Sequence, residues 1–205
     1  SREGEWFTGE KLKDTAYFRN FDKNAKGVIR VFMNADSTDP VLYESGKKPA
    51  PYIRPDVVIP AMHGLHGEDG TLQALFELKD IPYTSAGVTG SAVGMDKIVM
   101  KAVLKEAGLP VLDYHAFSSA DWRADEHLVV AQIEQELAPS YPLVVKPADL
   151  GSSIGVFVAS NREELYGRIR EALAYSRRVL VEPLLEQRRE INCAVLGDAE
   201  DLTWS

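Results

Sequence analysis

The chain has 205 residues, of which 26% are charged and 45% hydrophobic, and its formal net charge is −8 at pH 7. This length is enough to bury a real core in one large domain or two small ones. The acidic balance disfavours general attraction to nucleic acid or to anionic membranes, so a polyanion would have to bind in a local basic pocket. The sequence therefore predicts neither a nucleic-acid nor a membrane partner.

Cys193 is the single cysteine, which excludes an intrachain disulfide, and its apolar neighbours favour a buried position. The first residues contain no apolar signal core, and no apolar run reaches membrane-spanning length. We therefore expect a cytoplasmic protein.

Residues 1–50 alternate short apolar pieces, at 6–7, 28–33 and 41–43, with turn-forming residues. This pattern predicts strands joined by turns. These residues carry no predicted catalytic role.

Residues 56–62 form a compact apolar run, which predicts a strand covered on both faces. A polar, glycine-rich loop follows at 63–70. The helical spacing of Leu72, Leu75 and Phe76 then predicts a helix, with Asp69 as a possible N-cap. Open α/β sheets bind ligands where a strand passes through such a loop into a helix.

The 63–70 loop offers histidine, carboxylates and the donors of a helix start, which suit a substrate carboxylate or a developing negative charge. A metal site is the weaker reading, because His63 and His66 have no further His or Cys nearby. A capped, hydrogen-bonded turn with no ligand remains open.

Residues 81–84 predict a short strand, and residues 91–107 a long helix that ends at Gly108. The buried stripe of this helix is predicted from its apolar residues, and most of its lysines, Lys101 included, are expected in solvent. Lys97 differs because it lies near a predicted break between lobes, where a cleft would open. The expected stripe consists of Val93, Ile98, Val103 and Leu104.

Residues 112–139 are polar and helix-prone, and residues 125–137 are the expected helix. His115 and His127 show no partner in the sequence. We expect surface or packing positions for both rather than ligand binding.

Residues 141–158 predict a strand that carries Lys146, a loop of small residues at 151–155, and a second strand. Glycine permits close backbone approach, and a lysine beside exposed amides suits a phosphate. The structural alternative is an ordinary hairpin with a solvated lysine.

Residues 160–163 form a capping-box pattern before a helix whose apolar face contains Leu165 and Ile169. A strand at 179–182 then ends in Glu182, a linker follows, and another strand is expected at 189–197. Leu184 and Leu185 could contact an adenine ring, and Glu182 could accept from its amino group. A strand-end charge in water is the alternative for Glu182.

Four segments together resemble the D-alanine–D-alanine ligase family of the ATP-grasp superfamily, in order and separation as well as in residues. The first two are 63–70 and Met95-Asp96-Lys97. The third is Val145-Lys146-Pro147 with 151–155, and the fourth is Val181-Glu182 with Arg189-Glu190-Ile191. The resemblance covers nearly all of residues 56–197, and residues 4–9 also resemble the family. Phosphate loops of the G-x-x-x-x-G-K-[ST] and G-x-G-x-x-G types are absent from the sequence.

The resemblance implies an ATP-dependent ligase that joins two D-alanines for peptidoglycan through a D-alanyl phosphate. It implies that His63 lies near the first D-alanine, that Glu68 supports it and that Ser152 orients substrate. Lys97 and Lys146 would hold the ATP phosphates under the loop formed by Gly151, Ser152, Ser153, Ile154 and Gly155. The implied adenine and ribose contacts are Glu182, Pro183, Leu184, Leu185 and Glu190.

The implied fold is α/β ATP-grasp: an incomplete N-terminal lobe at 1–88, a central ATP-binding α+β lobe at 89–185 and the start of a C-terminal lobe at 186–205. The family's first glutamate, lid tyrosine, catalytic arginine and ligands for Mg²⁺ or Mn²⁺ have no counterpart in these residues, so no metal ligand is assigned and this chain alone is expected to be inactive. The resemblance also implies a homodimer. A ligase for D-lactate or D-serine, or a nucleotide-binding fragment without chemistry, are the alternatives.

Overall fold

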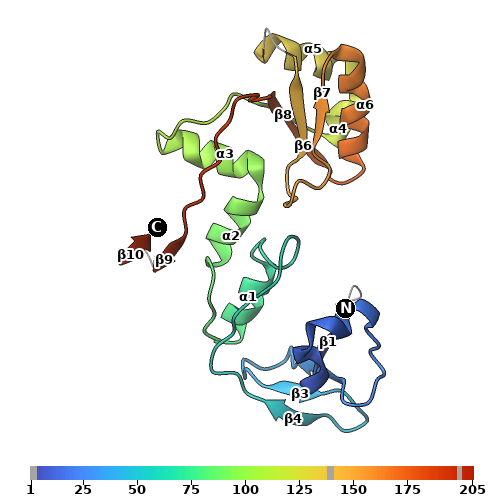
Figure 1. Ribbon diagram of the computed structural model, residues 1–205, viewed down its shortest axis with the longest axis vertical. Helices are drawn as coiled ribbons and strands as arrows, with labels where there is room; N and C mark the ends of the chain where they lie inside the picture. The colour runs from blue at the N-terminus through green and yellow to red at the C-terminus, as the bar shows by residue number, and fades with distance from the viewer. Residues whose placement is uncertain (1–3, 138–140, 198–199) are drawn as a thin grey trace. The chain divides into compact units, whose positions relative to one another are not determined.

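The computed structural model describes residues 4–137, 141–197 and 200–205. Contacts divide the chain into two compact units, Ser1–Leu109 with Ala148–Ile154, and Pro110–Pro147 with Gly155–Ser205 (Figure 1). Each unit has its own helices and strands. The lobe boundaries expected from the sequence stay predictions.

The first unit begins with an antiparallel sheet in the order β1-β2-β3-β4. Two 3₁₀ helices, η1 (Glu10–Lys13) and η2 (Thr15–Asn20), lie between its first two strands. Strands are thus confirmed in the three apolar pieces expected at the start of the chain. The strands are β1 (Trp6–Thr8), β2 (Ile29–Met33), β3 (Leu42–Glu44) and β4 (Ala50–Ile53).

The strand expected at 56–62 with both faces covered is wrong. Among the described residues of this segment, Val58 forms one isolated parallel bridge, with Tyr83. Val57 is 55% exposed and Ile59 is 74% exposed. A single bridge provides no neighbouring strands to cover the apolar side chains, so the run does not become a strand of a sheet.

Helix α1 (Thr71–Leu78) follows the 63–70 loop, as expected, and buries Phe76. The helix expected at 91–107 is two helices, α2 (Val88–Met95) and α3 (Lys97–Glu106). The break falls at Asp96, whose carboxylate accepts from the N–H groups of Ile98 and Val99 and caps α3. An aspartate inside an apparent helical pattern was therefore the start signal of a second helix.

The end of α3 is confirmed, because Gly108 has a φ of +74° directly after the helix. The predicted burial of the α3 side chains is wrong at two positions: Val103 is 49% exposed, and Lys101 is buried. Lys101 lies four residues after Lys97 and so shares its face of the helix. That face, rather than the one through Val103, is the more enclosed.

The second unit contains a four-stranded antiparallel sheet in the order β5-β8-β6-β7. Sequence analysis missed β5 (His115–Ser118) in a segment that is polar overall. The other strands are β6 (Leu143–Pro147), β7 (Phe157–Ala159) and β8 (Arg178–Pro183), and the helices are α4 (Ser119–Ala124), α5 (Glu126–Glu136) and α6 (Arg162–Leu173). Figure 1 shows α6 beside β6 and β7, which it contacts.

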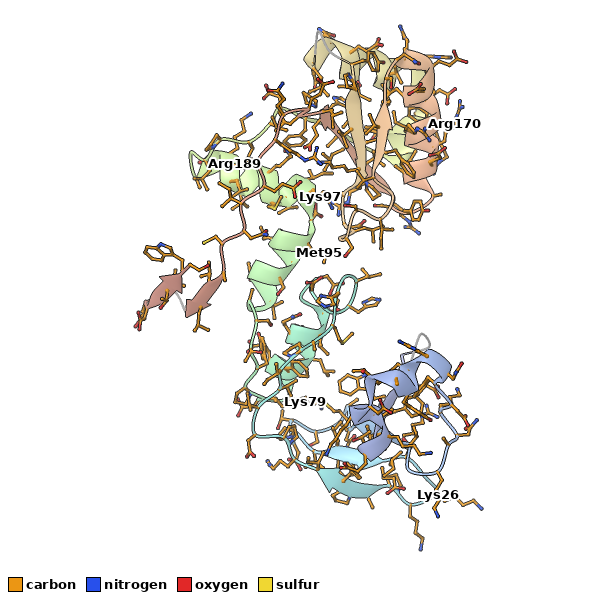
Figure 2. All side chains as sticks on the ribbon, viewed as in Figure 1. Lys26, Lys79, Met95, Lys97, Arg170 and Arg189 are labelled. Carbon is orange, nitrogen blue, oxygen red and sulfur yellow. The ribbon has the colours of Figure 1, made fainter. Side chains whose placement is uncertain are left out.

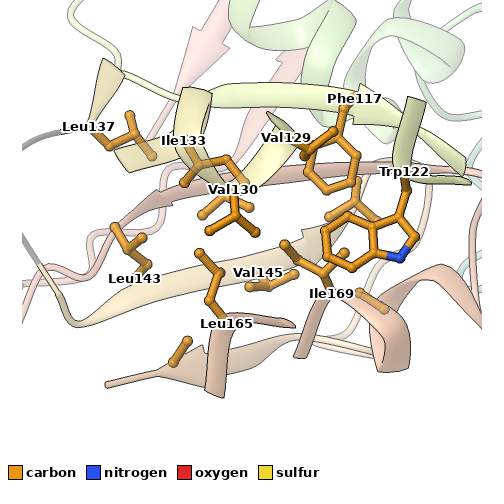
Figure 3. Close-up of a cluster of buried hydrophobic side chains, with 14 residues drawn as sticks. Phe117, Trp122, Val129, Val130, Ile133, Leu137, Leu143, Val145, Leu165 and Ile169 are labelled. Carbon is orange, nitrogen blue, oxygen red and sulfur yellow. The ribbon is translucent and has the colours of Figure 1, made fainter. Parts of the chain in front are cut away.

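One face of this sheet packs on the three helices to form the core (Figure 3). Ile133 of α5 and Leu165 and Ile169 of α6 are fully buried against Val145 and Val181 of the central strands. Successive side chains of a strand point to opposite faces. Lys146 and Glu182, next to these core residues in sequence, therefore lie on the sheet face away from the helices.

The two histidines of this unit have structural partners. His115 Nδ1 lies 2.8 Å from Glu136 Oε2, and His127 Nδ1 lies 2.8 Å from the Tyr166 hydroxyl. These contacts fit the packing roles expected for both histidines.

Asn161 caps α6 by accepting from the Glu164 N–H, one residue later than the expected capping box.

The strand expected at 189–197 is shorter than predicted. It is β9 (Val195–Gly197), which pairs only with β10 (Leu202–Trp204) in the described part of the chain. Cys193 is exposed, contrary to the expected buried position, because residues 189–194 lie outside any sheet. None of the helices described here has both the length and the apolar character to cross a membrane.

Candidate functional site

The loop between residues 63 and 70 is held by its own polar groups. The amides of Gly67 and Glu68 donate to the Gly64 carbonyl over 3.1 and 2.9 Å. The Glu68 carboxylate accepts from the Gly64 N–H over 2.5 Å, and its other oxygen lies 3.8 Å from His63 Nδ1. Glu68 thus closes the loop and faces the His63 ring, which is 86% exposed.

Asp69 fixes the junction between this loop and α1. Its carboxylate accepts from the His66 N–H over 2.9 Å, and from the Thr71 N–H and hydroxyl over 3.0 and 2.7 Å. Burial raises the pKa of Asp69, but these hydrogen bonds outweigh burial and hold the pKa below its ordinary value. The N-cap position expected for Asp69 belongs to Gly70, whose φ of +90° suits glycine.

A cavity of about 610 Å³ opens beside this loop within the first unit. Its lining brings together four of the residues singled out in the sequence: His63, Glu68, Lys97 and Gly151. Gln73 and Ser85 line it as well. The cavity therefore combines an imidazole, a carboxylate, an ammonium group and the start of the 151–155 loop, which can hold a small zwitterion next to an anion.

Lys97 is the first residue of α3, directly after the break that follows Met95 (Figure 2). Its backbone N–H donates to the Ala148 carbonyl over 2.8 Å. Its ammonium group donates to the Leu150 carbonyl. Lys97 therefore holds the first residues of the 148–154 loop with both its backbone and its side chain.

The tip of that loop is a tight turn closed by the Ile154 N–H, which donates to the Gly151 carbonyl over 3.1 Å. Ser152 and Ser153 occupy its two central positions with φ of 52° and 57°. Left-handed backbone costs a residue other than glycine about 1–2 kcal/mol. Both serines and Ile154 are exposed, so the hydroxyl groups are accessible to a ligand.

Gly155 ends the loop where only glycine fits. Its φ is +71°, and a Cβ there would lie 2.7 Å from Pro147 Cγ. The equivalent position at Gly151 has no neighbouring atom within 4 Å. The loop is therefore anchored tightly at Gly155 and loosely at Gly151.

Lys146 of β6 and Glu182 of β8 form an ion pair in the second unit. The Glu182 side chain is 7% exposed and that of Lys146 is 26% exposed. Val144 of β6 pairs with Glu182 of β8, so these two side chains point to the same sheet face. Lys146 lies two residues after Val144 and therefore points to that face as well. Glu182 is consequently not a strand-end charge in water.

The end of β8 and the linker after it offer few backbone donors. Pro183, the last residue of β8, has no N–H group, and the Leu184 N–H donates to the Pro142 carbonyl over 3.1 Å. Leu185 is 48% exposed. Glu190 is exposed, and its carboxylate accepts from Arg188 Nε over 3.0 Å.

The predicted site residues fall in both units. His63, Glu68, Lys97 and the loop Gly151–Ile154 belong to the first, and Lys146, Glu182–Leu185 and Glu190 to the second. A single nucleotide site formed by all of them stays a prediction. The described residues contain no group of three or more His, Cys, Asp or Glu side chains able to hold a metal ion.

Two contributors were missed from the sequence. Gln73 is fully buried in α1, and the Leu150 carbonyl holds Lys97. A polar residue three positions before the buried Phe76, on the same helix face, was the available signal for Gln73. A backbone carbonyl gives no residue-type signal, so Leu150 was not identifiable.

Two family models match the chain. The model described as "D-ala D-ala ligase N-terminus" matches residues 1–86, and the one described as "D-ala D-ala ligase C-terminus" matches residues 103–204. A D-alanine–D-alanine ligase from Heliobacterium modesticaldum is 39% identical over 97% of this chain and 52% of its own length. One from Bacillus velezensis is 46% identical over 71% of this chain and 40% of its own length.

Solved structures give the same result. The D-alanine–D-alanine ligase from Helicobacter pylori matches with a TM-score of 0.79 and 27% identity over 97% of this chain and 58% of its own. The VanG D-Ala:D-Ser ligase from Enterococcus faecalis matches with a TM-score of 0.77 and 32% identity over 99% of this chain and 56% of its own. The expected α/β ATP-grasp fold is confirmed, and the chain spans about half the length of the relatives it matches.

Proposed function

The chain belongs to the D-alanine–D-alanine ligase family, and on that premise we propose that it contributes to the ATP-dependent joining of two D-alanines for peptidoglycan. The observation that carries the proposal is the cavity lined by His63, Glu68, Lys97 and Gly151. A family match along almost the whole chain supports it.

The proposed reaction has two steps. A carboxylate oxygen of the first D-alanine attacks the γ-phosphorus of ATP, which releases ADP and leaves a D-alanyl phosphate. The amino nitrogen of the second D-alanine then attacks the acyl carbon, loses a proton, and expels inorganic phosphate. Phosphoryl transfer of this kind depends on positioning and on neutralising charge rather than on a protein nucleophile.

In this proposal the residues near the cavity act on the transferred phosphate and the first substrate. Lys97 binds a phosphate oxygen, and the Gly151–Ile154 loop covers the phosphates with its amides and the hydroxyls of Ser152 and Ser153. The Ser152 hydroxyl also orients the substrate. His63 and Glu68 hold the first D-alanine, since they provide a donor and an acceptor side by side.

The second unit is proposed to bind the rest of the nucleotide. Lys146 binds phosphate, and Glu182, which pairs with Lys146, contacts adenine together with Pro183, Leu184 and Leu185. Glu190 contacts ribose. A divalent ion, Mg²⁺ or Mn²⁺, would neutralise phosphate charge in such chemistry. The described residues contain no group of three or more His, Cys, Asp or Glu side chains that could hold it, and we assign it no ligand.

The direct test is ADP release that depends on D-alanine. We expect turnover from a full-length protein that contains these residues, and none from the 205-residue chain alone. Robust turnover by the chain would contradict the expected inactivity, and none by the full-length protein would contradict the ligase assignment. Cytoplasmic location and homodimer formation remain part of the proposal.

The D-Ala:D-Ser ligase among the structural matches favours a second candidate, a ligase whose second substrate is not D-alanine. To separate the two candidates, the full-length protein is given labelled D-alanine as the first substrate, and D-alanine, D-serine and D-lactate compete as the second substrate. Predominant D-alanyl-D-alanine supports the first candidate. Predominant mixed product supports the second.

A further inference from the structure

Gln73 is the most enclosed polar residue beside the cavity, with an exposed fraction of 1%. It lies in the first turn of α1, and its side-chain Nε2 donates to the Gly67 carbonyl over 3.0 Å. The same nitrogen lies 3.4 Å from the Ser85 hydroxyl. One carboxamide thus connects α1 with the 63–70 loop and with the segment that follows residues 81–84.

The other end of this carboxamide has no hydrogen bond. In the described part of the chain, Gln73 Oε1 is the one buried side-chain polar atom without a partner. Rotating the amide would not help, because the Gly67 carbonyl can only accept and requires the NH₂ group. A buried oxygen without a donor is costly, so this carboxamide contributes less to folding than a fully bonded one would, although an apolar replacement would leave the carbonyl of the buried Gly67 without its donor.

What the carboxamide adds is control over Gly67. The Gly67 backbone packs closely against Met62, because a Cβ on Gly67 would lie 2.6 Å from Met62 Cβ. Gly67 is followed by Glu68, whose carboxylate accepts from Gly64 and approaches the His63 ring. A continuous series of contacts therefore runs from the helix through Gln73 and Gly67 to Glu68 and His63.

We propose that Gln73 is a positioning residue for the pair formed by His63 and Glu68. Because Gln73 holds the Gly67 carbonyl, it fixes the backbone position of Glu68. It thereby orients the Glu68 carboxylate toward the His63 imidazole. The inference rests on the proposed function for its consequence in catalysis. Its structural part concerns the loop alone and is measurable without substrate.

The test compares Gln73→Met with Gln132→Met, a matched change at an exposed position of α5. Amide hydrogen exchange is measured in the 205-residue chain. We expect the Gly64, Gly67 and Glu68 amides of Gln73→Met to exchange at least about tenfold faster, a larger increase than that of the amides of the β1-β2-β3-β4 sheet in the same unit. Gln132→Met should change exchange in neither the loop nor the sheet.

Unchanged exchange in the loop overturns the proposal. An equal increase in exchange throughout the first unit overturns it as well, because Gln73 would then support folding of the whole unit rather than the loop. In the full-length ligase, Gln73→Met should lower kcat about tenfold with the KM for ATP within about twofold. An equal loss in both constants contradicts positioning, whereas inactivity of the parent enzyme contradicts the proposed function and leaves the exchange result to judge Gln73.

Discussion

The β5-β8-β6-β7 sheet and the 63–70 loop are stabilised in different ways. The sheet packs apolar side chains from every one of its strands on α4, α5 and α6, and most of these side chains are fully buried. The loop has little apolar cover, and Glu68, Asp69 and Gln73 hold it by hydrogen bonds. Packing gives the sheet its stability, and directional contacts give the loop its geometry.

The largest test of this contrast is Ile133→Ala in the core of the sheet. Ile133 is fully buried, and removing such a side chain leaves a cavity, so we expect the free energy of unfolding of the second unit to fall by about 2–5 kcal/mol. Leu196→Ala is the control, because Leu196 is 79% exposed and should cost at most about 0.5 kcal/mol. Urea titration followed by circular dichroism measures both. Equal costs would contradict the assigned core.

Lys146→Met tests whether the buried Glu182 charge in the sheet is tolerated only because Lys146 pairs with it. The substitution leaves the Glu182 carboxylate buried without its cation, and we expect a loss of about 2–4 kcal/mol in unfolding free energy. Adding Glu182→Gln should restore much of it, since the buried charge is then removed. A double mutant that is as unstable as the sum of the single changes would show that the two groups do not interact.

Gly155→Ala tests the tight anchor of the 151–155 loop. The new Cβ would meet Pro147, and the left-handed backbone disfavours alanine, so we expect a loss of about 2 kcal/mol. Gly151→Ala should cost under about 1 kcal/mol because nothing lies near its Cβ position. Chemical denaturation separates the two changes, and a costlier change at Gly151 would reverse the assignment.

Asp69→Asn gives the smallest expected effect, about 1 kcal/mol at pH 7, because an amide accepts weaker hydrogen bonds from His66 and Thr71 than a carboxylate does. The folded pKa of Asp69 lies below its ordinary value of 3.8. Its contribution is therefore complete above that value and is lost as the pH falls through the folded pKa. Unfolding curves of the variant should converge with those of the parent once the pH lies below the folded pKa of Asp69. Parallel pH profiles would contradict this role.

Local sequence patterns predicted the regular parts of the fold well. The apolar spacing of Leu165 and Ile169 identified α6, and the small residues after Lys146 identified the β6–β7 hairpin. The failures concern what lies beside a segment. The apolar run 56–62 lacks a sheet around it, and Cys193 lies in an exposed stretch. Neither outcome is visible in the run itself, since burial depends on distant residues.

The candidate site was predictable in its residue types and less so in its contacts. Sequence motifs indicated His63, Glu68 and Lys97, and the structure brings these three to one cavity. The Leu150 carbonyl accepts from Lys97, and the carboxamide of Gln73 donates to Gly67, next to Glu68. Backbone groups carry no sequence signature, and a buried glutamine on a helix resembles a surface residue until its environment is known.

The most direct test of nucleotide binding is the affinity of the 205-residue chain for ATP and for adenosine, measured by calorimetry in the parent, Lys97→Met and Lys146→Met. If both ammonium groups bind phosphate, each substitution weakens ATP binding at least about tenfold and leaves adenosine binding unchanged. Undiminished ATP affinity in either variant, or an equal loss of adenosine, would contradict the claim that these two lysines hold the phosphates of one nucleotide.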